Sequence, residues 1–236
     1  MDLVKQTWTK EDIKEYSNYL LSLTKGKDKA EMEKKIANTG MKCIAVQSAD
    51  IKRVINQIYK GNYLEFLDFF SWNNLSETFV IGGLISKLKD FELVKKYLNK
   101  YAMMSDNWAT CDTLKFKITD KNAELFFDLA KHYLTSIYTF KRRIGVILLL
   151  KMVGIYDTNK ILLVVSDLVE EREYYVNMAI AWLISECFVK DRNTTLNFFK
   201  NNNLNKFVIN KAISKCRDSF RVSTQDKELL LNFRKK

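Results

Sequence analysis

The stretch at residues 48–59, SADIKRVINQIY, has the pattern that decides the fold. Its apolar residues recur at spacings of three and four, which puts them on one stripe of a helix: Ile51, Val54, Ile55 and Ile58. Ser48 is of a residue type that caps helix N-termini, and Gly61 follows as a helix terminator. The spacing therefore predicts an amphipathic helix that begins at Ser48 and ends before Gly61.

The same helical pattern continues along the chain, and almost nothing alternates with period two. Thr9 with Asp12 resembles a capping box, Thr119, Asp191 and Ser223 are cap candidates, and Gly40 is a candidate terminator. We expect helices at residues 9–23, 28–38, 48–59, 63–70, 76–88, 90–101, 106–117, 120–134, 137–153, 159–168, 172–189, 192–201, 204–216 and 224–234.

The composition supports an all-α chain. There is no Pro and there are only 7 Gly among 236 residues, which argues against a sandwich or barrel of many short strands. The predicted helices pair at intervals of roughly 35–45 residues, the period of HEAT-like repeats. We therefore predict one all-α domain over residues 1–236, a HEAT-like helical-repeat solenoid with a basic concave surface. A helical bundle or two globular helical domains would have a similar pattern.

The charge points to a polyanionic partner. Lys and Arg total 39 against 28 Asp and Glu, a net charge of +11, which favours nucleic acid over a merely basic soluble protein. The four cysteines form no CxxC and there is one His, so we expect no metal and no cofactor. No run of 18 apolar residues occurs, so we expect no membrane partner. We expect a cytoplasmic protein that is nucleoid-associated when bound to DNA.

A candidate site lies at residues 105–117, SDNWATCDTLKFK. If Ser105 or Asp106 caps a helix here, Trp108 and Asp112 lie one turn apart on the same face. The indole face attracts a cation and the carboxylate adds a full opposite charge, so the pair is suited to a developing positive charge. The alternative is a core Trp beside a surface Asp.

Further along, three consecutive cations, Lys141, Arg142 and Arg143, begin an apolar helix. Cations at a helix N-terminus oppose the helix dipole, and a bound phosphate would compensate for them; ordinary solvated charge is the alternative. Trp182 lies in another long apolar helix, where a core position is the alternative.

The carboxyl end is basic with interspersed aromatic residues, and Lys211 and Lys215 there would suit backbone phosphates; a solubilising surface is the alternative.

Three motifs, in their order and spacing, resemble the AlkD-like DNA alkylation-repair glycosylases, which are built from HEAT-like repeats. The motifs are NWATCD with Trp108 and Asp112, KRRIGVIL with Arg143, and YYVNMAIAWLISE with Trp182. The resemblance covers about residues 28–220 and implies a monofunctional glycosylase that excises cationic N3- and N7-alkylated purines from double-stranded DNA. It implies that Asp112, Trp108 and Trp182 form the catalytic cleft and that Arg143 contacts DNA.

The chain departs from the family pattern at two places. The N-terminal aromatic that lines the family's DNA cleft has no equivalent near residues 36–41, and residues 183–185, LIS, replace the usual Arg after the second Trp. A non-catalytic, DNA-structure-binding HEAT-like paralogue and a protein-interaction scaffold are the competing interpretations. The presence of both Trp residues and of Asp112 disfavours the first, and the positive net charge disfavours the second. We expect a monomer that acts on alkylated duplex DNA.

Overall fold

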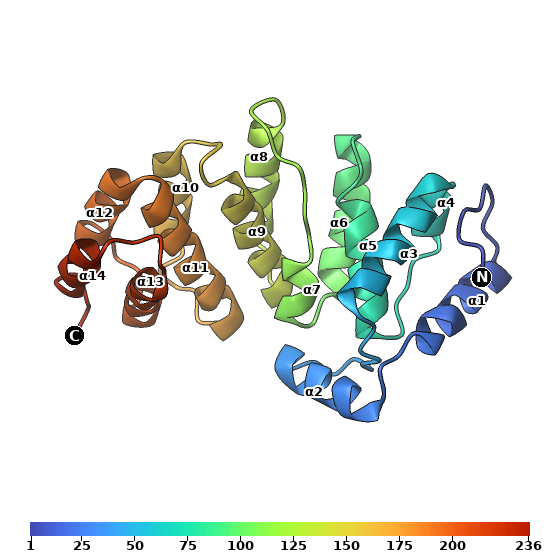
Figure 1. Cartoon of the computed structure of the whole chain (residues 1–236). Helices are drawn as coiled ribbons and strands as arrows, with labels where there is room; N and C mark the ends of the chain where they lie inside the picture. Colours follow the sequence, from blue (N-terminus) through green and yellow to red (C-terminus); the bar gives the residue numbers. More distant parts are fainter. The chain divides into compact units, whose positions relative to one another are not determined.

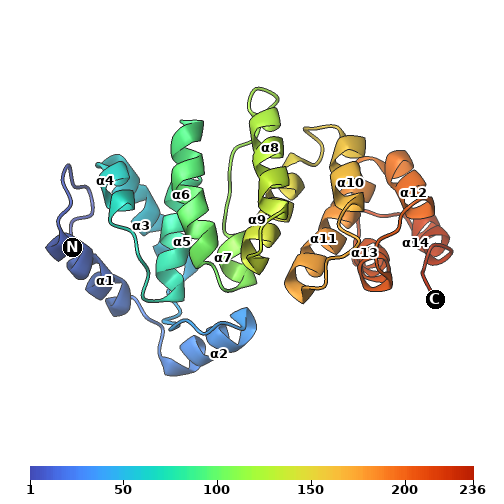
Figure 2. The same cartoon turned by 180° about the vertical axis from the view of Figure 1, so that it is seen from behind.

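The computed structural model describes residues 1–236 and contains fourteen helices and no strand, which confirms the predicted all-α helical-repeat architecture (Figures 1 and 2). None of the helices is both long enough and apolar enough to cross a bilayer. The helices are α1 (Lys10–Ser22), α2 (Lys27–Ala37), α3 (Ser48–Lys60), α4 (Tyr63–Asp68), α5 (Leu75–Ile85), α6 (Phe91–Met104), α7 (Trp108–Asp112), α8 (Ala123–Leu134), α9 (Thr139–Met152), α10 (Thr158–Ser166), α11 (Tyr174–Lys190), α12 (Arg192–Lys200), α13 (Lys206–Asp218) and α14 (Thr224–Leu231).

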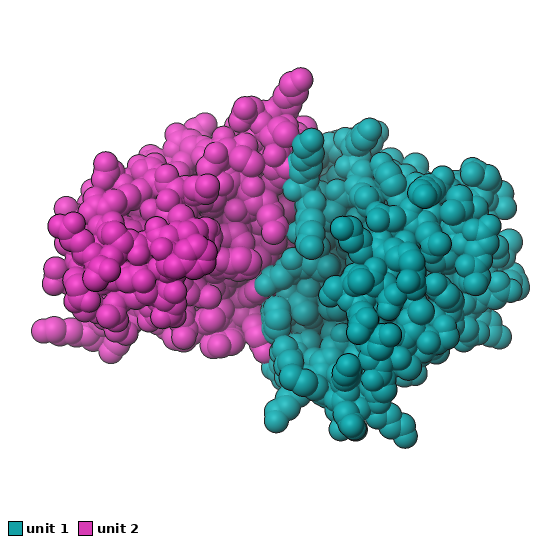
Figure 3. Space-filling view, in the orientation of Figure 1, with its two compact units in different colours: residues 1–117 teal, residues 118–236 magenta.

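The helices gather in two compact units, unit 1 at Met1–Lys117 and unit 2 at Ile118–Lys236 (Figure 3). Each unit has its own buried apolar residues. The single domain and the basic concave surface stay predictions.

Unit 1 is organised around α5. Nine of the eleven residues of α5 are buried, because α1, α3, α4, α6 and α7 all pack against it. A helix that is apolar on every side is buried in this way. Gly82 and Gly83 allow close packing on α5: a Cβ on Gly82 would lie 2.7 Å from the Tyr101 hydroxyl, and one on Gly83 would clash with Ile55 Cδ1.

Unit 2 consists of helix pairs in two layers. Helices α9 and α13 pack on the two sides of α11, while α8 packs on α9, and α12 packs on both α10 and α11. Figures 1 and 2 show α9, α11 and α13 side by side within this unit. Successive pairs thus repeat the same arrangement, as expected of a helical-repeat fold.

Several predicted helix ends are confirmed. Thr9 and Asp12 form a capping box at α1, and Asp191 and Ser223 cap α12 and α14. Gly61 is the C-cap of α3, with its N–H bonded to the Ile58 carbonyl. These ends are the ones where the capping side chain and the apolar periodicity agree.

Other predicted helix ends are wrong. Ser48 is the first residue of α3, and Gln47 is its N-cap. Asn122, not Thr119, precedes α8, and Asn38 ends α2 in the left-handed conformation at φ 51°, two residues before Gly40. Asn adopts this conformation more readily than most residues because its short polar side chain hydrogen-bonds locally.

Candidate functional site

Asn107 begins the short helix that carries Trp108 and Asp112. Its side-chain oxygen accepts the backbone N–H of Thr110 at 2.9 Å, so the prediction that Ser105 or Asp106 is the cap is wrong. The Ser105 hydroxyl donates instead to the Tyr101 carbonyl. Asp106 accepts the Thr39 hydroxyl at 2.8 Å, which ties the start of α7 to the chain just after α2.

Trp108 and Asp112 are the first and last residues of α7, and both line one cavity of about 840 Å³ in unit 1. The predicted pair therefore shares a cavity. The Trp108 indole N–H donates to the Ile36 carbonyl at 3.1 Å, so the ring is held at its edge by the end of α2. Trp108 also lines a neighbouring, mostly apolar cavity of about 380 Å³ together with Met32, Ile36 and other residues.

The other charged groups of this cavity are not among the residues predicted from the sequence. Lys52, Lys87 and Lys115 line it together with Glu33 and Asp112. Lysines in the wall of a cavity attract the phosphates of a ligand, and a carboxylate in the same cavity attracts a positively charged part of that ligand.

Glu33 lines the cavity and hydrogen-bonds to the backbone beside it. Its carboxylate accepts the Ala45 N–H at 2.9 Å, and Ala45 has a positive φ of 50°. Burial raises the pKa of Glu33, although the backbone donors at Ala45 and Ile44 and the Cys43 thiol oppose that rise. Glu33 therefore stabilises the turn that leads from α2 to α3.

Helix α7 ends at Asp112, five residues before the predicted end at 117. Beyond it Leu114 and Phe116 are buried while Lys115 and Lys117 are exposed, which is the alternation of an extended segment. The Lys115 N–H donates to the Ser86 hydroxyl at 2.8 Å. The alternation of apolar and charged residues at positions 114–117, LKFK, is the sequence signal that the helix ends early and that Lys115 lies at the cavity.

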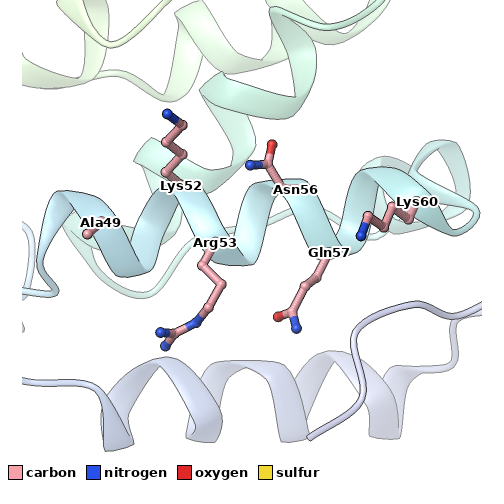
Figure 4. A pocket seen from close by; sticks show the side chains of 6 residues that line it. All are labelled: Ala49, Lys52, Arg53, Asn56, Gln57 and Lys60. Atoms are coloured by element: carbon pink, nitrogen blue, oxygen red, sulfur yellow. The ribbon is translucent and has the colours of Figure 1, made fainter.

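A third hollow, of about 460 Å³, lies on the polar face of α3. Figure 4 shows Lys52 and Asn56 extending from one side of this helix and Arg53 and Gln57 from the other. Lys52 and Asn56 also line the Trp108–Asp112 cavity. The polar face of α3 thus extends the cationic surface beyond that cavity.

The predicted DNA contacts of the KRR motif lie in unit 2, where all three side chains are engaged. Arg143 is 5% exposed and donates to the Tyr175 carbonyl. Arg142 binds both carboxylate oxygens of Glu171, at 2.7 and 3.1 Å. The Lys141 ammonium lies 4.8 Å from the centre of the Tyr133 ring, and burial lowers the pKa of Lys141. The alternative of ordinary solvated charge therefore fails for both arginines.

Trp182 is partly exposed on α11 of unit 2, so it is not a fully buried core residue. Its neighbour one turn on, Glu186, accepts two hydrogen bonds from the Arg221 guanidinium, at 2.8 and 2.6 Å. Hydrogen bonding from Arg221, and less strongly from the Trp182 side chain, lowers the pKa of Glu186. Glu186 therefore links Trp182 to Arg221.

The two C-terminal lysines differ in position. Lys211 lines a hollow of about 520 Å³ on α13, together with Lys206, Phe207 and Arg234, whereas Lys215 lies outside it. No group of three or more His, Cys, Asp or Glu side chains in the structure is arranged to hold a metal ion.

The comparisons with known proteins agree with the motifs. The family described as DNA alkylation repair enzyme matches residues 17–216, a range that includes Trp108, Asp112, Arg143 and Trp182. No curated protein matches the chain.

Proposed function

The chain belongs to the family of DNA alkylation repair enzymes, and from this premise we propose that it is a monofunctional DNA glycosylase. It hydrolyses the N-glycosidic bond of cationic N3- and N7-alkylated purines in duplex DNA, the first step of base excision repair. The observation that carries this proposal is that Trp108 and Asp112, one turn apart on α7, line the same cavity.

The proposed reaction uses the charge of the lesion. An alkylated purine that already bears a positive charge leaves as a neutral base, and it takes the electron pair of the glycosidic bond with it. The positive charge moves to the deoxyribose, where Asp112 offers a full negative charge and Trp108 an aromatic face. Water then adds to the sugar carbon and releases its proton. No strong general acid is needed because the leaving group requires no proton.

The surroundings of Asp112 support a phosphate-bearing ligand. Lys52, Lys87 and Lys115 line the same cavity, and a nucleotide carries phosphates on both sides of its sugar. We assign these lysines to the flanking phosphates and the carboxylate to the sugar between them. Lys211 is assigned to phosphates further along the strand, because it lies in an open hollow with Lys206 and Arg234.

Three further residues predicted from the sequence lie in unit 2. Trp182 is proposed as a catalytic indole on its family resemblance and its partial exposure. For Arg142 and Arg143 the contacts to Glu171 and Tyr175 favour a role in positioning the start of α11 over a role as free phosphate ligands.

The competing interpretation is a DNA-binding paralogue without catalysis. Base release separates the two: duplexes that carry single N7-methylguanine, N3-methyladenine, ethenoadenine or hypoxanthine are incubated with the protein, and the freed base is measured by chromatography. We expect release of the two cationic bases above the spontaneous rate and no release of the two neutral ones. Binding to all four duplexes without any release would favour the paralogue, and equal release of neutral bases would contradict the charge-dependent mechanism.

A further inference from the structure

Unit 2 presents a row of aromatic rings that the proposed glycosylase reaction does not use. The aromatic row consists of Phe140, Tyr175, Tyr174 and Phe207. Successive ring centres lie 5.7, 5.3 and 5.8 Å apart, with interplanar angles of 37°, 79° and 51°. The rings are tilted against one another and not stacked face to face. Tyr174 is 55% exposed and Phe207 41%.

The row is a product of the helical repeat. Phe140 is the second residue of α9, Tyr174 and Tyr175 are the first two of α11, and Phe207 is the second of α13. These three helices pack side by side, so aromatic residues at the same position in each helix fall in one line. A row that extends over three repeats is suited to an extended ligand with a repeated aromatic group.

Positive charge accompanies the row. Lys206 precedes Phe207 in the sequence. Beyond Phe207 lies the hollow of about 520 Å³ whose lining includes Lys206, Lys211 and Arg234, with Phe207 as its aromatic wall. The ligand therefore carries anionic groups beside its aromatic groups.

A buried polar network holds the row in place. Arg142 binds Glu171, whose backbone carbonyl accepts the side-chain amides of Asn177 and Asn205 at 3.3 and 3.4 Å. Asn205 is also the N-cap of α13, and Arg143 donates to the carbonyl of Tyr175. The starts of α11 and α13, which carry three of the four rings, are thus preorganised, which reduces the entropy lost on binding.

We propose that the aromatic row and the adjoining hollow of unit 2 bind single-stranded DNA. Bases stack on Tyr174 and Phe207, and phosphates contact Lys206, Lys211 and Arg234. Unpaired bases have free faces and every base has one, so stacking of this kind does not depend on sequence. A paired base in a duplex has both faces covered by its neighbours. The aromatic row is therefore selective for unpaired strands, for example those at a nick or a replication fork, whereas the adjoining hollow contacts the phosphates of single-stranded and duplex DNA alike.

The test uses a fluorescently labelled thymidine oligonucleotide, which contains no purine and no lesion, so its result does not depend on glycosylase activity. Binding is measured by anisotropy at physiological salt for wild type, Tyr174→Ala, Phe207→Ala and the matched control Phe220→Ala. Phe220 is 93% exposed in the same unit but lies outside the row. We expect each row variant to weaken binding by roughly 5- to 150-fold, the usual effect of removing one base–aromatic stack. Phe220→Ala, Tyr174→Phe and Phe207→Tyr should bind like wild type.

Four outcomes would overturn the proposal: no binding of the oligonucleotide by wild type, equal binding by the row variants and Phe220→Ala, equal binding of a strand of abasic sites, or a preference for the ribonucleotide strand. Thermal melting checks that the alanine variants are folded. If the protein binds the oligonucleotide but releases no alkylated base, the single-strand site stands and the proposed glycosylase function is wrong. If it releases alkylated bases but does not bind the oligonucleotide, the glycosylase function stands and the single-strand site is wrong.

Discussion

At the residue scale, Arg143 shows how burial changes the role of a charged side chain. Its guanidinium donates to the Tyr175 carbonyl inside unit 2. Arg143→Ala should lower the free energy of unfolding by about 1–3 kcal/mol, because the substitution leaves a buried acceptor without its charged donor. Arg143→Lys should recover only part of the lost free energy of unfolding, because lysine lacks the planar guanidinium group with its several N–H donors.

Denaturant unfolding measures this loss, with Arg172→Ala as the matched control. Arg172 has 66% of its side-chain surface exposed and pairs with Glu170, which is 85% exposed, so its removal should change stability by no more than about 0.5 kcal/mol. If Arg143→Ala were as stable as this control, the contact with Tyr175 would contribute nothing and the arginine would again be a candidate for direct DNA contact.

Trp108 has two separable properties, an N–H that donates to the Ile36 carbonyl and an aromatic face. Trp108→Phe removes the first and retains a ring, whereas Trp108→Ala removes both. If the ring face stabilises the sugar cation, alanine should slow base release by about 0.5–2 kcal/mol, or roughly 2- to 30-fold, and phenylalanine by less. Single-turnover rates on N7-methylguanine duplexes measure the difference. Equal rates for all three proteins would show that the indole is only a wall of the cavity.

Residues were predictable from the sequence where a local pattern specifies them. The four-residue spacing of Trp108 and Asp112 puts them on one face if a single helical turn joins them, and α7 is such a turn. Lys52 lies on α3 and Lys87 just after α5, both distant in sequence from Asp112, and the packing of α3 and α7 on α5 brings them to its cavity. Nothing local distinguishes them from the other lysines of the chain. Burial of Arg143 was unpredictable for the same reason, because its acceptor lies 32 residues away.

At the scale of the elements, Tyr101 connects three helices. It lies on α6, is fully buried, and its hydroxyl lies 3.1 Å from the Thr78 carbonyl of α5 and 3.0 Å from the Thr110 carbonyl of α7. Tyr101→Phe leaves these buried carbonyls without the hydroxyl, which should destabilise unit 1 by about 1–3 kcal/mol. Because α7 has only five residues, this loss should also loosen the Trp108–Asp112 helix.

Amide hydrogen exchange on α7 tests the effect of Tyr101→Phe. Faster exchange at Thr110 and its neighbours than in wild type, with α11 unchanged, is the expected result. A variant that loses stability without any change in exchange at α7 would mean that the hydroxyl serves only the packing of α5 and α6.

Helices were predictable as elements because their apolar stripes repeat over three or more turns, as in α3. Their ends were less predictable where two residues compete for one role. Asn107 caps α7 although Ser105 and Asp106 precede it, because Asp106 is bound to Thr39 and Ser105 to Tyr101. The Thr39–Asp106 bond is a tertiary contact, about which a local pattern contains no information, whereas the Ser105–Tyr101 bond is local to the end of α6.

At the scale of the whole molecule, the net charge of +11 and the cationic surfaces of both units predict binding dominated by phosphates. Each neutralised phosphate releases counterions, so affinity for duplex DNA should fall steeply with salt. For six or more phosphate contacts the loss is about 10³-fold or more between roughly 50 and 200 mM salt. Anisotropy titrations over this range measure the slope, and a flat dependence would contradict DNA as the partner.

The central claim is that the Asp112 carboxylate stabilises the positive charge that develops on the deoxyribose. Asp112→Asn keeps the shape and the hydrogen-bonding capacity of the side chain and removes its charge. Its effect on single-turnover release of N7-methylguanine from duplex DNA is the most direct test. We predict a rate about 100- to 1,000-fold below wild type, with DNA binding retained or tightened because a negative charge has left a site that faces phosphates. Release of N7-methylguanine by Asp112→Asn at the wild-type rate would contradict the account.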